Sequence, residues 1–518
     1  MSQMPRIYIY DTTLRDGSQA ETVSFSLEDK QEIVSLLDGF GMDFIEGGMP
    51  FANPKDEALF SQDMHLKKSK MVAFGSTCKV NVPADQDENL RALVKSAAEW
   101  VCIFGKSSEF HVKVALETTL EENLRMVKDS VSFLKESGKR VIFDAEHFFD
   151  GFVSDREYAM KVLSAARDGG AEWIVLCDTN GGTLPTKVGE ITAEVCREFG
   201  NIGIHCHNDC DMAVACSLAA VENGARMVQG TVNGIGERCG NANLCSILPV
   251  LKLKLGYDIP MDLTQLKEFT HSVAEVANVR VNSGSPFVGD KAFAHKGGMH
   301  VSALMKNPKT YEHIPPESVG NKRRVLISDM SGRASIAEKI KEMGIKVSDA
   351  DLEKISTYVK EMESHGYQYE GADASFQLLV SRAVGKENKP FDIQGFRLHM
   401  EGVGISELDS EASIKIRNNV GDVEHTAADA EGPVNALDKA MRKALSKFYP
   451  EIENIRLTDY KVRVIDEKAG TEAYVRVLIR STNGKQSWNT VGVSENIIEA
   501  SVIALSDSYE YAILMSGN

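Results

Sequence analysis

Eight short apolar runs alternate with amphipathic stretches across residues 6–256, and this alternation is the strongest constraint on the fold. Strands are expected at residues 6–10, 44–47, 71–74, 100–104, 140–143, 173–177, 202–205 and 227–231. Helical stretches such as 27–40, 120–137 and 212–222 lie between them. Eight strand–helix repeats over about 250 residues predict a closed (β/α)8 TIM barrel, an α/β fold. An open doubly wound sheet is the alternative, but no Gly-x-Gly-x-x-Gly motif follows the first strand.

Polar residues concentrate where six of the eight predicted strands end. These polar segments are Asp11–Gly17, Glu46–Gly48, Asp144–His147, Asp178–Gly182, His205 with His207, and Asn233–Asn241. Catalytic groups of a barrel lie at the carboxyl ends of its strands, because the loops that follow the strands surround one common mouth. The sequence therefore predicts an active site at that end of the barrel.

His205 and His207 flank Cys206 at the end of the seventh predicted strand. Side chains alternate between the two faces of a strand, so both imidazoles are expected to point the same way. Two neutral nitrogen donors and a nearby carboxylate form half of a metal site. Two polar histidines in a loop remain the alternative interpretation of this motif.

Composition and charge narrow the classes of function. The length of 518 residues predicts two or three domains, and the formal net charge of −17 argues against nucleic acid or an anionic membrane as a partner. The sequence has no uninterrupted run of about 18 apolar residues, so no transmembrane helix is expected. The N-terminus enters a strand almost at once, so no signal peptide is expected. Nine cysteines without a Cys-x-x-Cys pair fit the reduced thiols of a cytoplasmic protein.

A mostly helical region and an internal repeat follow the barrel. Residues 257–370 have helical patterns with glycine-rich breaks and end in a linker-like tract at 363–371. Strand, turn, strand and helix are expected at 412–417, 418–422, 423–427 and 435–448, and again at 473–480, 483–484, 486–492 and 496–506. The two copies predict a pseudo-symmetric α/β module with a regulatory or dimerising role.

Several separated motifs resemble those of the Claisen-condensing acyltransferases, the family of 2-isopropylmalate, homocitrate and citramalate synthases. These motifs are Leu14–Gln19, His205–Asp209, Gly234–Asn241, the pair His300 and Tyr311, and the tail segments Glu431–Leu437 and Asp459–Arg463. They cover nearly the whole chain in the family's order. Glu46–Asp56 and Ala145–Gly151 are most similar to the citramalate-forming members. We therefore expect a catalytic barrel at residues 1–275, helical linker subdomains that complete the active site at 276–370, and a C-terminal regulatory domain at 371–518.

The resemblance implies that an enolate formed from acetyl-CoA attacks a 2-oxo acid and that the CoA ester is then hydrolysed. It also implies a divalent metal, Mg²⁺ or Mn²⁺, held by Asp16, His205 and His207, with Asn241 as a further ligand directly or through water. Such a donor set leaves open positions for the keto and carboxylate oxygens of the substrate. The same set holds Fe(II) in oxygenases, and the lack of cysteine ligands argues against a structural zinc.

Arg15 is the residue that the resemblance places at the developing charge. It is expected to donate to the keto oxygen while Glu46 orients it, and a purely structural ion pair between the two is the alternative. Gln19 and Asp16 are expected to bind substrate in the same motif. Phe74 and Phe104 end the third and fourth predicted strands, where they could narrow the pocket to fit pyruvate.

Three further residues at the barrel mouth receive expected roles from the resemblance. Thr179 is expected to bind the substrate carboxylate, although its hydroxyl could instead stabilise the turn that follows the sixth strand. Glu146 is expected to assist in proton transfer or to position the thioester. Asp144 lies on the same face of the fifth strand and is expected either at the substrate or behind the site.

His300 and Tyr311 lie beyond the barrel, and the resemblance makes them an acid–base relay that reaches the active site of the partner subunit. Histidine suits proton transfer near neutral pH, and a loop histidine in a glycine-rich turn is the alternative. The resemblance thus implies a homodimer whose active site is completed in trans. The C-terminal region is expected to bind a feedback inhibitor. This inhibitor would be isoleucine for a citramalate-forming enzyme and leucine for a 2-isopropylmalate synthase.

Three alternatives to a citramalate-forming enzyme remain open. The first is another member of the family, a 2-isopropylmalate or homocitrate synthase, which would prefer a larger oxo acid. The second is a lyase of the same superfamily that runs carbon–carbon bond formation in reverse. The third is a non-catalytic barrel that serves as a scaffold or binding protein and shows no metal-dependent release of CoA.

Overall fold

The structure is a computed structural model that describes residues 5–61, 64–326, 333–385, 389–403, 406–465 and 473–516. The chain divides into two compact units, which are considered separately. The first unit comprises residues 1–293 and 314–322, and the second comprises residues 294–313 and 323–518. No helix in the described part of the chain has the length and apolar character needed to cross a membrane.

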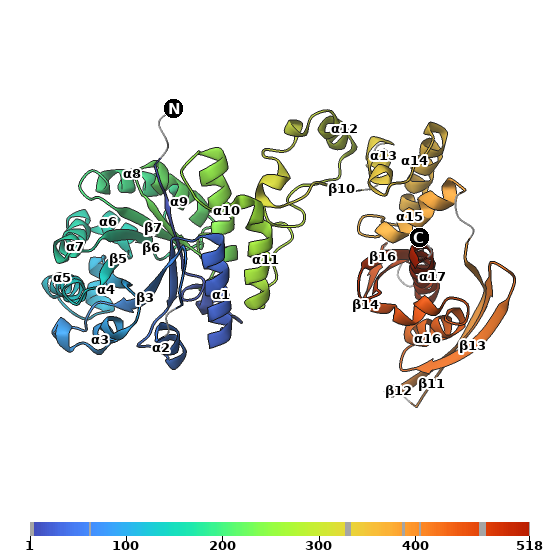
Figure 1. Ribbon diagram of the computed structural model, residues 1–518, viewed down its shortest axis with the longest axis horizontal. Helices are drawn as coiled ribbons and strands as arrows, with labels where there is room; N and C mark the ends of the chain where they lie inside the picture. The colour runs from blue at the N-terminus through green and yellow to red at the C-terminus, as the bar shows by residue number, and fades with distance from the viewer. Residues whose placement is uncertain are drawn as a thin grey trace. The chain divides into compact units, whose positions relative to one another are not determined.

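The first unit contains a closed parallel barrel, which confirms the predicted fold class. Its strands are β1 (Tyr8–Asp11), β2 (Phe44–Gly48), β3 (Lys70–Ser76), β4 (Trp100–Lys106), β5 (Arg140–Glu146), β6 (Trp173–Asp178), β7 (Ile202–Cys206) and β8 (Met227–Gly230). The strands pair in chain order, and β8 pairs with β1 to close the ring. Figure 1 shows the barrel and its helices in the blue-to-green part of the chain.

Helices surround the barrel. They are α1 (Leu27–Phe40), α2 (Pro54–Phe60), α3 (Glu88–Lys95), α4 (Glu109–Val114), α5 (Leu120–Glu136), α6 (Phe148–Ser154), α7 (Arg156–Gly169), α8 (Pro185–Val195), α9 (Ala213–Glu222), α10 (Leu244–Pro249) and α11 (Leu266–Val276). Helix α1 matches its predicted bounds because both ends carry strong local signals. Ser26 and Asp29 form a capping box at its start, and Gly41 ends it with a left-handed φ of +100°.

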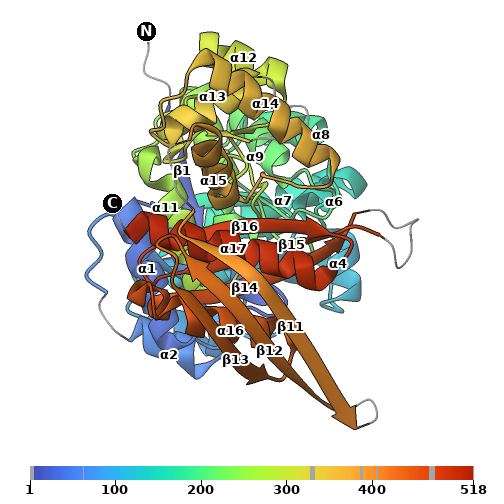
Figure 2. The same ribbon diagram turned by 90° about the vertical axis from the view of Figure 1, so that its right-hand side faces the viewer.

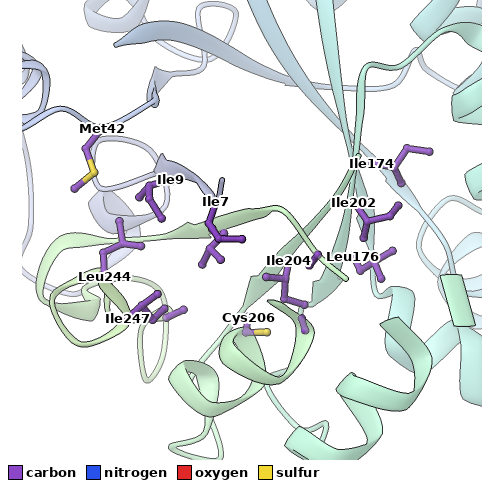
Figure 3. Close-up of a cluster of buried hydrophobic side chains, with 14 of the residues drawn as sticks. Ile7, Ile9, Met42, Ile174, Leu176, Ile202, Ile204, Cys206, Leu244 and Ile247 are labelled. Atoms are coloured by element: carbon purple, nitrogen blue, oxygen red, sulfur yellow. The ribbon is translucent and has the colours of Figure 1, made fainter. Parts of the chain in front are cut away.

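Strand side chains alternate between two apolar layers. Ile202, Ile204 and Cys206 of β7 face outward and pack in the main core beneath the helices, where Figure 3 labels them beside Ile174 and Leu176 of β6. A second buried cluster, which includes Tyr10, Phe44 and Trp100, fills the barrel interior. Because odd positions take the opposite face, His205 of β7 and His207 directly after it are directed toward the interior and the mouth of the barrel.

The second unit begins with short elements and helices. It contains β9 (Ala294–His295), α12 (Gly298–Lys306), β10 (Arg324–Val325), α13 (Arg333–Glu342), α14 (Asp349–Ser364) and α15 (Asp373–Ala383). Helix α15 shares a buried core with strand residues far along the chain, because Phe376 and Val380 pack in one cluster with Val491 and Val493. A cavity of about 980 Å³ is lined by residues of α14, α15 and α17 and contains none of the predicted site residues.

Two similar three-stranded antiparallel sheets with one helix each complete the second unit (Figure 2). The first half is β11 (Phe391–Val403), β12 (Ser406–Asn418), β13 (Val423–Ala430) and α16 (Pro433–Leu445). The second half is β14 (Arg456–Val464), β15 (Val475–Thr482), β16 (Ser487–Ser494) and α17 (Ile497–Ser516). The predicted strand–turn–strand–helix repeat is present, but each copy has an additional first strand, β11 or β14, that the sequence pattern did not predict.

Candidate active site

Asp16, His205 and His207 meet at the carboxyl end of the barrel strands. Asp16 follows β1, and its carboxylate Oδ2 lies 3.4 Å from His205 Nε2 and 4.0 Å from His207 Nε2. All three side chains are buried, and one donor atom from each lies within 4.8 Å of the other two. Among the described residues, they form the one group of three or more such donors in this arrangement. The structure thus brings together the three side chains that the sequence assigned to a metal.

These donors fit a divalent cation. Asp16 Oδ1 and Asn241 Oδ1 are buried and have no hydrogen-bond partner among the described residues. Burial would raise the pKa of Asp16, but Arg15 and His205 beside it hold that pKa well below the ordinary value. Burial and the neighbouring His205 lower the pKa of His207 to about 4, so that imidazole is neutral at neutral pH. Unpartnered oxygens beside neutral imidazole form the donor set that a divalent ion requires.

Asn241 is placed against His207 by the loop that follows β8. The two residues form an isolated antiparallel bridge, and Asn241 Nδ2 donates to the carbonyl of Ile235 over 3.4 Å. A Cβ atom at Gly236 would lie 2.1 Å from Asn241 Nδ2, so only glycine leaves room for this amide. The glycine-rich motif therefore has a physical purpose, which is to seat Asn241 beside the histidines.

Arg15 is fixed on two sides. Its Nε donates to Glu46 Oε1 over 2.5 Å, and its guanidinium carbon lies 3.8 Å from the ring centroid of Phe74. Glu46 is fully buried and also accepts hydrogen bonds from the hydroxyls of Tyr10 and Thr12, both over 2.5 Å. Arg15 Nη1 also lies 3.2 Å from Asp16 Oδ2, and the other N–H groups of its terminal nitrogens remain available to a ligand in the pocket.

The site opens into a pocket of about 300 Å³. Its lining contains Arg15, Asp16, Gln19, Met49, Phe74, Phe104, Asp144, Glu146, Cys177, Thr179, His205, His207, Glu237 and Arg238. Every predicted substrate-binding residue is in this set, and so is Glu146. The rings of Phe74 and Phe104 stack with centroids 5.5 Å apart and form one apolar side of the pocket.

Thr179 and Glu146 hold defined positions at the mouth. The backbone N–H of His147 donates to Thr179 Oγ1 over 2.8 Å, which leaves the hydroxyl hydrogen of Thr179 available for another acceptor. His147 can make this contact because its backbone takes a left-handed φ of +57°. The carboxylate of Glu146 forms an ion pair with Lys106 at the end of β4.

Two residues that the sequence did not assign also support the site. Arg238 binds Asp209 through two hydrogen bonds of 2.8 and 2.9 Å and donates to the carbonyl of Thr179 over 2.8 Å, so it ties together the loops after β6, β7 and β8. Gln229 of β8 is fully buried, and its Oε1 lies 2.8 Å from His205 Nδ1. Arg238 lies within the Gly234–Asn241 motif, whereas nothing in the sequence distinguishes Gln229 from other residues of an apolar strand.

His300 and Tyr311 belong to the second unit. His300 is on α12, and Tyr311 follows a short helical turn at Pro308–Thr310. Their rings stack with centroids 4.2 Å apart and planes 25° apart. Tyr311 is 46% exposed, and the adjacent Met299 is 84% exposed. The structure therefore pairs these two side chains on a surface of their own unit.

Family models match most of the chain. The HMGL-like model matches residues 6–273, which include the barrel and the group Asp16, His205 and His207. A model described as homocitrate synthase post-HMGL domain-like matches residues 287–367, and the LeuA allosteric (dimerisation) domain matches residues 370–513. The barrel and its site, together with the first of these matches, define the class: the chain belongs to the HMGL-like family.

Similar proteins of known function show to which family within this class the chain belongs. An (R)-citramalate synthase of Aquifex aeolicus is 53% identical over 518 residues and covers 98% of each chain. Another, of Geobacter sulfurreducens, is 50% identical with the same coverage. A 2-isopropylmalate synthase of Methanocaldococcus jannaschii is 32% identical and covers 97% of this chain and 94% of its own. Within its class the chain belongs to the (R)-citramalate synthase family, which confirms the resemblance seen in its motifs.

Proposed function

We propose that this chain is an acyltransferase that condenses acetyl-CoA with pyruvate to give citramalate and free CoA, the first step of a route to isoleucine. The main support is that Asp16, His205 and His207 lie together beside Arg15, which is held in place by Glu46. The chain is also 53% identical to an (R)-citramalate synthase. A 2-isopropylmalate synthase is the second candidate, because a relative with that name aligns over nearly the whole chain.

The proposed cation is Mg²⁺ or Mn²⁺, held by Asp16, His205 and His207 and by Asn241 directly or through water. When bound, it supplies a Lewis acid that polarises the keto group of the oxo acid. Arg15 lies next to Asp16, with its Nη1 3.2 Å from Asp16 Oδ2, so its free N–H groups can donate to the same keto oxygen as negative charge develops there.

Other residues of the pocket orient the two substrates. The hydroxyl of Thr179 donates to the carboxylate of the oxo acid, since its oxygen already accepts from His147. Gln19 lies at the exposed side of the pocket and binds the same substrate. Glu146, paired with Lys106, positions the thioester so that its methyl group faces the keto carbon.

His300 removes a proton from the acetyl methyl group in this proposal, with Tyr311 as the second member of the relay. The two rings are in contact, and both side chains have access to solvent rather than to the core of their own unit. We propose that they serve the barrel of the partner in a homodimer. Residues 1–275 would then be the catalytic domain, 276–370 the part that completes the active site, and 371–518 the regulatory domain.

Release of free CoA tests the reaction class and its acceptor. With acetyl-CoA and a panel of 2-oxo acids, thiol release is expected to be fastest with pyruvate and to stop in EDTA. One apolar methylene discriminates about 10- to 200-fold, and the stacked rings of Phe74 and Phe104 form an apolar wall of the pocket that would contact a branched chain. We therefore expect kcat/KM for pyruvate to exceed that for 2-oxoisovalerate by at least about 10-fold.

Two controls make this assay decisive. Restoring Mn²⁺ in excess over EDTA should recover thiol release, which separates metal removal from irreversible damage. Faster turnover of 2-oxoisovalerate than of pyruvate would replace the proposal with 2-isopropylmalate synthase. Thiol release from acetyl-CoA without any oxo acid would indicate simple thioester hydrolysis, and absence of release with every oxo acid would favour a binding protein.

We further propose that residues 371–518 bind isoleucine as a feedback inhibitor. The match of residues 370–513 to the LeuA allosteric (dimerisation) domain supports effector binding by this segment. Isoleucine is expected to lower the rate of thiol release at concentrations at which leucine has little effect. The full chain should be used, because truncation after α15 would uncover Phe376 and Val380, which share a core with Val491 and Val493. Stronger inhibition by leucine would contradict the assignment.

A further inference from the structure

Gln229 connects His205, one of the three proposed cation ligands, to the buried carboxylate of Asp144 on β5. It is fully buried on β8, between β7 and β1. Its Oε1 lies 2.8 Å from His205 Nδ1, and its Nε2 donates to Asp144 Oδ1 over 2.9 Å. Three side chains from β7, β8 and β5 thus form a continuous hydrogen-bonded chain that ends at the ligand cluster.

The direction of each hydrogen bond in this chain follows from chemistry. An ionised carboxylate only accepts hydrogen bonds, so Asp144 must receive the amide hydrogen of Gln229. The carbonyl oxygen of Gln229 then faces His205 and can only accept, so it selects the imidazole form with a hydrogen on Nδ1. That form leaves the lone pair of Nε2 free for a cation between this nitrogen and Asp16 Oδ2, which lies 3.4 Å away.

The second histidine lacks this support. Within the described ranges, His207 Nδ1 is buried without a hydrogen-bond partner, although His207 also faces Asp16 from 4.0 Å. The two histidines are therefore not equivalent. His205 is oriented from behind by a fixed amide, and His207 is held by its backbone bridge to Asn241.

We infer that Gln229 is a positioning residue for the cation site and that Asp144 acts through it. Gln229 keeps His205 in the ring orientation and tautomer that leave Nε2 free to bind a metal. Asp144 fixes which end of the Gln229 amide faces the histidine, rather than binding substrate. The inference rests on the cation proposed for Asp16, His205 and His207, and it deepens that proposal by naming what prepares the site.

The test measures Mn²⁺ affinity by titration calorimetry on full-length protein freed of metal with EDTA. Gln229→Leu removes the acceptor for His205 but leaves the Asp144 carboxylate without its hydrogen-bond donor. Asp144→Asn/Gln229→Leu also removes the negative charge of that carboxylate. Asp144→Asn/Gln229→Glu exchanges the amide and the carboxylate between the two positions. The carboxylate introduced at position 229 can still accept from His205, and the amide introduced at position 144 can donate to that carboxylate. Asn123→Leu is the matched control, because Asn123 is another fully buried amide, bound to the Lys106 carbonyl and the Tyr158 hydroxyl.

Loss of the acceptor is expected to weaken Mn²⁺ binding about 10- to 100-fold in both Gln229→Leu proteins. The exchanged pair should bind within about threefold of wild type, and Asn123→Leu should lower only the melting temperature measured in EDTA. The inference is overturned if Gln229→Leu binds like wild type, or if the exchanged pair binds as weakly as Asp144→Asn/Gln229→Leu. Wild-type protein without Mn²⁺ binding would refute the cation site itself, which distinguishes that failure from the failure of the role of Gln229.

Discussion

Replacing Arg15 with lysine is expected to lower kcat about 10²- to 10³-fold, the loss seen when one preorganised donor to a developing oxyanion is removed. Lysine keeps the positive charge but lacks the planar fork. It cannot bind Glu46 through Nε, lie flat on Phe74 and still present N–H groups to the pocket. The rate of CoA release at saturating pyruvate measures the effect, and circular dichroism with the melting temperature checks that the barrel remains folded.

Arg140→Lys provides the matched control for this substitution. Arg140 begins β5 at the opposite end of the barrel, where it binds Glu172 through two hydrogen bonds of 2.8 and 2.5 Å and lies over the ring of Trp100. It has the same kinds of partner as Arg15 but no access to the pocket. Its replacement should leave turnover unchanged. Near-normal turnover of Arg15→Lys would reduce the Arg15–Glu46 pair to a structural ion pair and remove the proposed electrostatic role.

Hybrid dimers of Asp16→Ala and His300→Ala are expected to recover activity that neither variant has alone. If His300 serves the partner's barrel, the chain with Asp16→Ala supplies an intact His300 to the barrel that retains Asp16, and this site is complete. The other site lacks both groups. A doubly tagged heterodimer, isolated after co-expression, should therefore show about half of the wild-type activity, since a two-fold symmetric dimer has two equivalent sites. Thiol release per dimer is the measurement.

The control hybrid combines His300→Ala with Tyr311→Phe. His300 and Tyr311 stack in the same unit, so neither site of this hybrid receives an intact pair in cis or in trans. It should show no more activity than its parent homodimers. An inactive Asp16→Ala/His300→Ala heterodimer, together with active wild-type protein handled in the same way, would place the proton relay in the same chain as the barrel that it serves.

The barrel could be predicted from the sequence because each strand is buried on both faces and is therefore a compact apolar run. β11 and β14 could not, because much of their surface faces solvent and their patterns contain many polar residues. In β14, for example, Arg456, Arg463 and Val464 are exposed. A strand that buries few side chains shows little alternation of apolar and polar residues in its sequence. Its place in the sheet depends on pairing with the neighbouring strand.

The grouping of Asp16, His205 and His207 was predictable from motif residues, but its supporting contacts were not. Asp16 and the histidines lie next to strand ends, where polar side chains contrast with apolar strands. Gln229 lies within a strand, and its two partners are 24 and 85 residues away in the chain. A hydrogen bond between residues so far apart leaves no local signal in one sequence. The stacking of Arg15 on Phe74 is hidden for the same reason, since only the packed barrel brings the two together.

Closure of the barrel has a consequence for how the enzyme matures. The three proposed ligands come from the segment after β1 and from the end of β7, and these strands are neighbours only through β8, which pairs with both. During synthesis, a nascent chain that ends before residue 230 holds the aspartate and both histidines without the strand that places them side by side. If these three residues hold a cation, we therefore expect it to bind only after the eighth strand has joined the barrel, so that metal binding follows folding of the first unit.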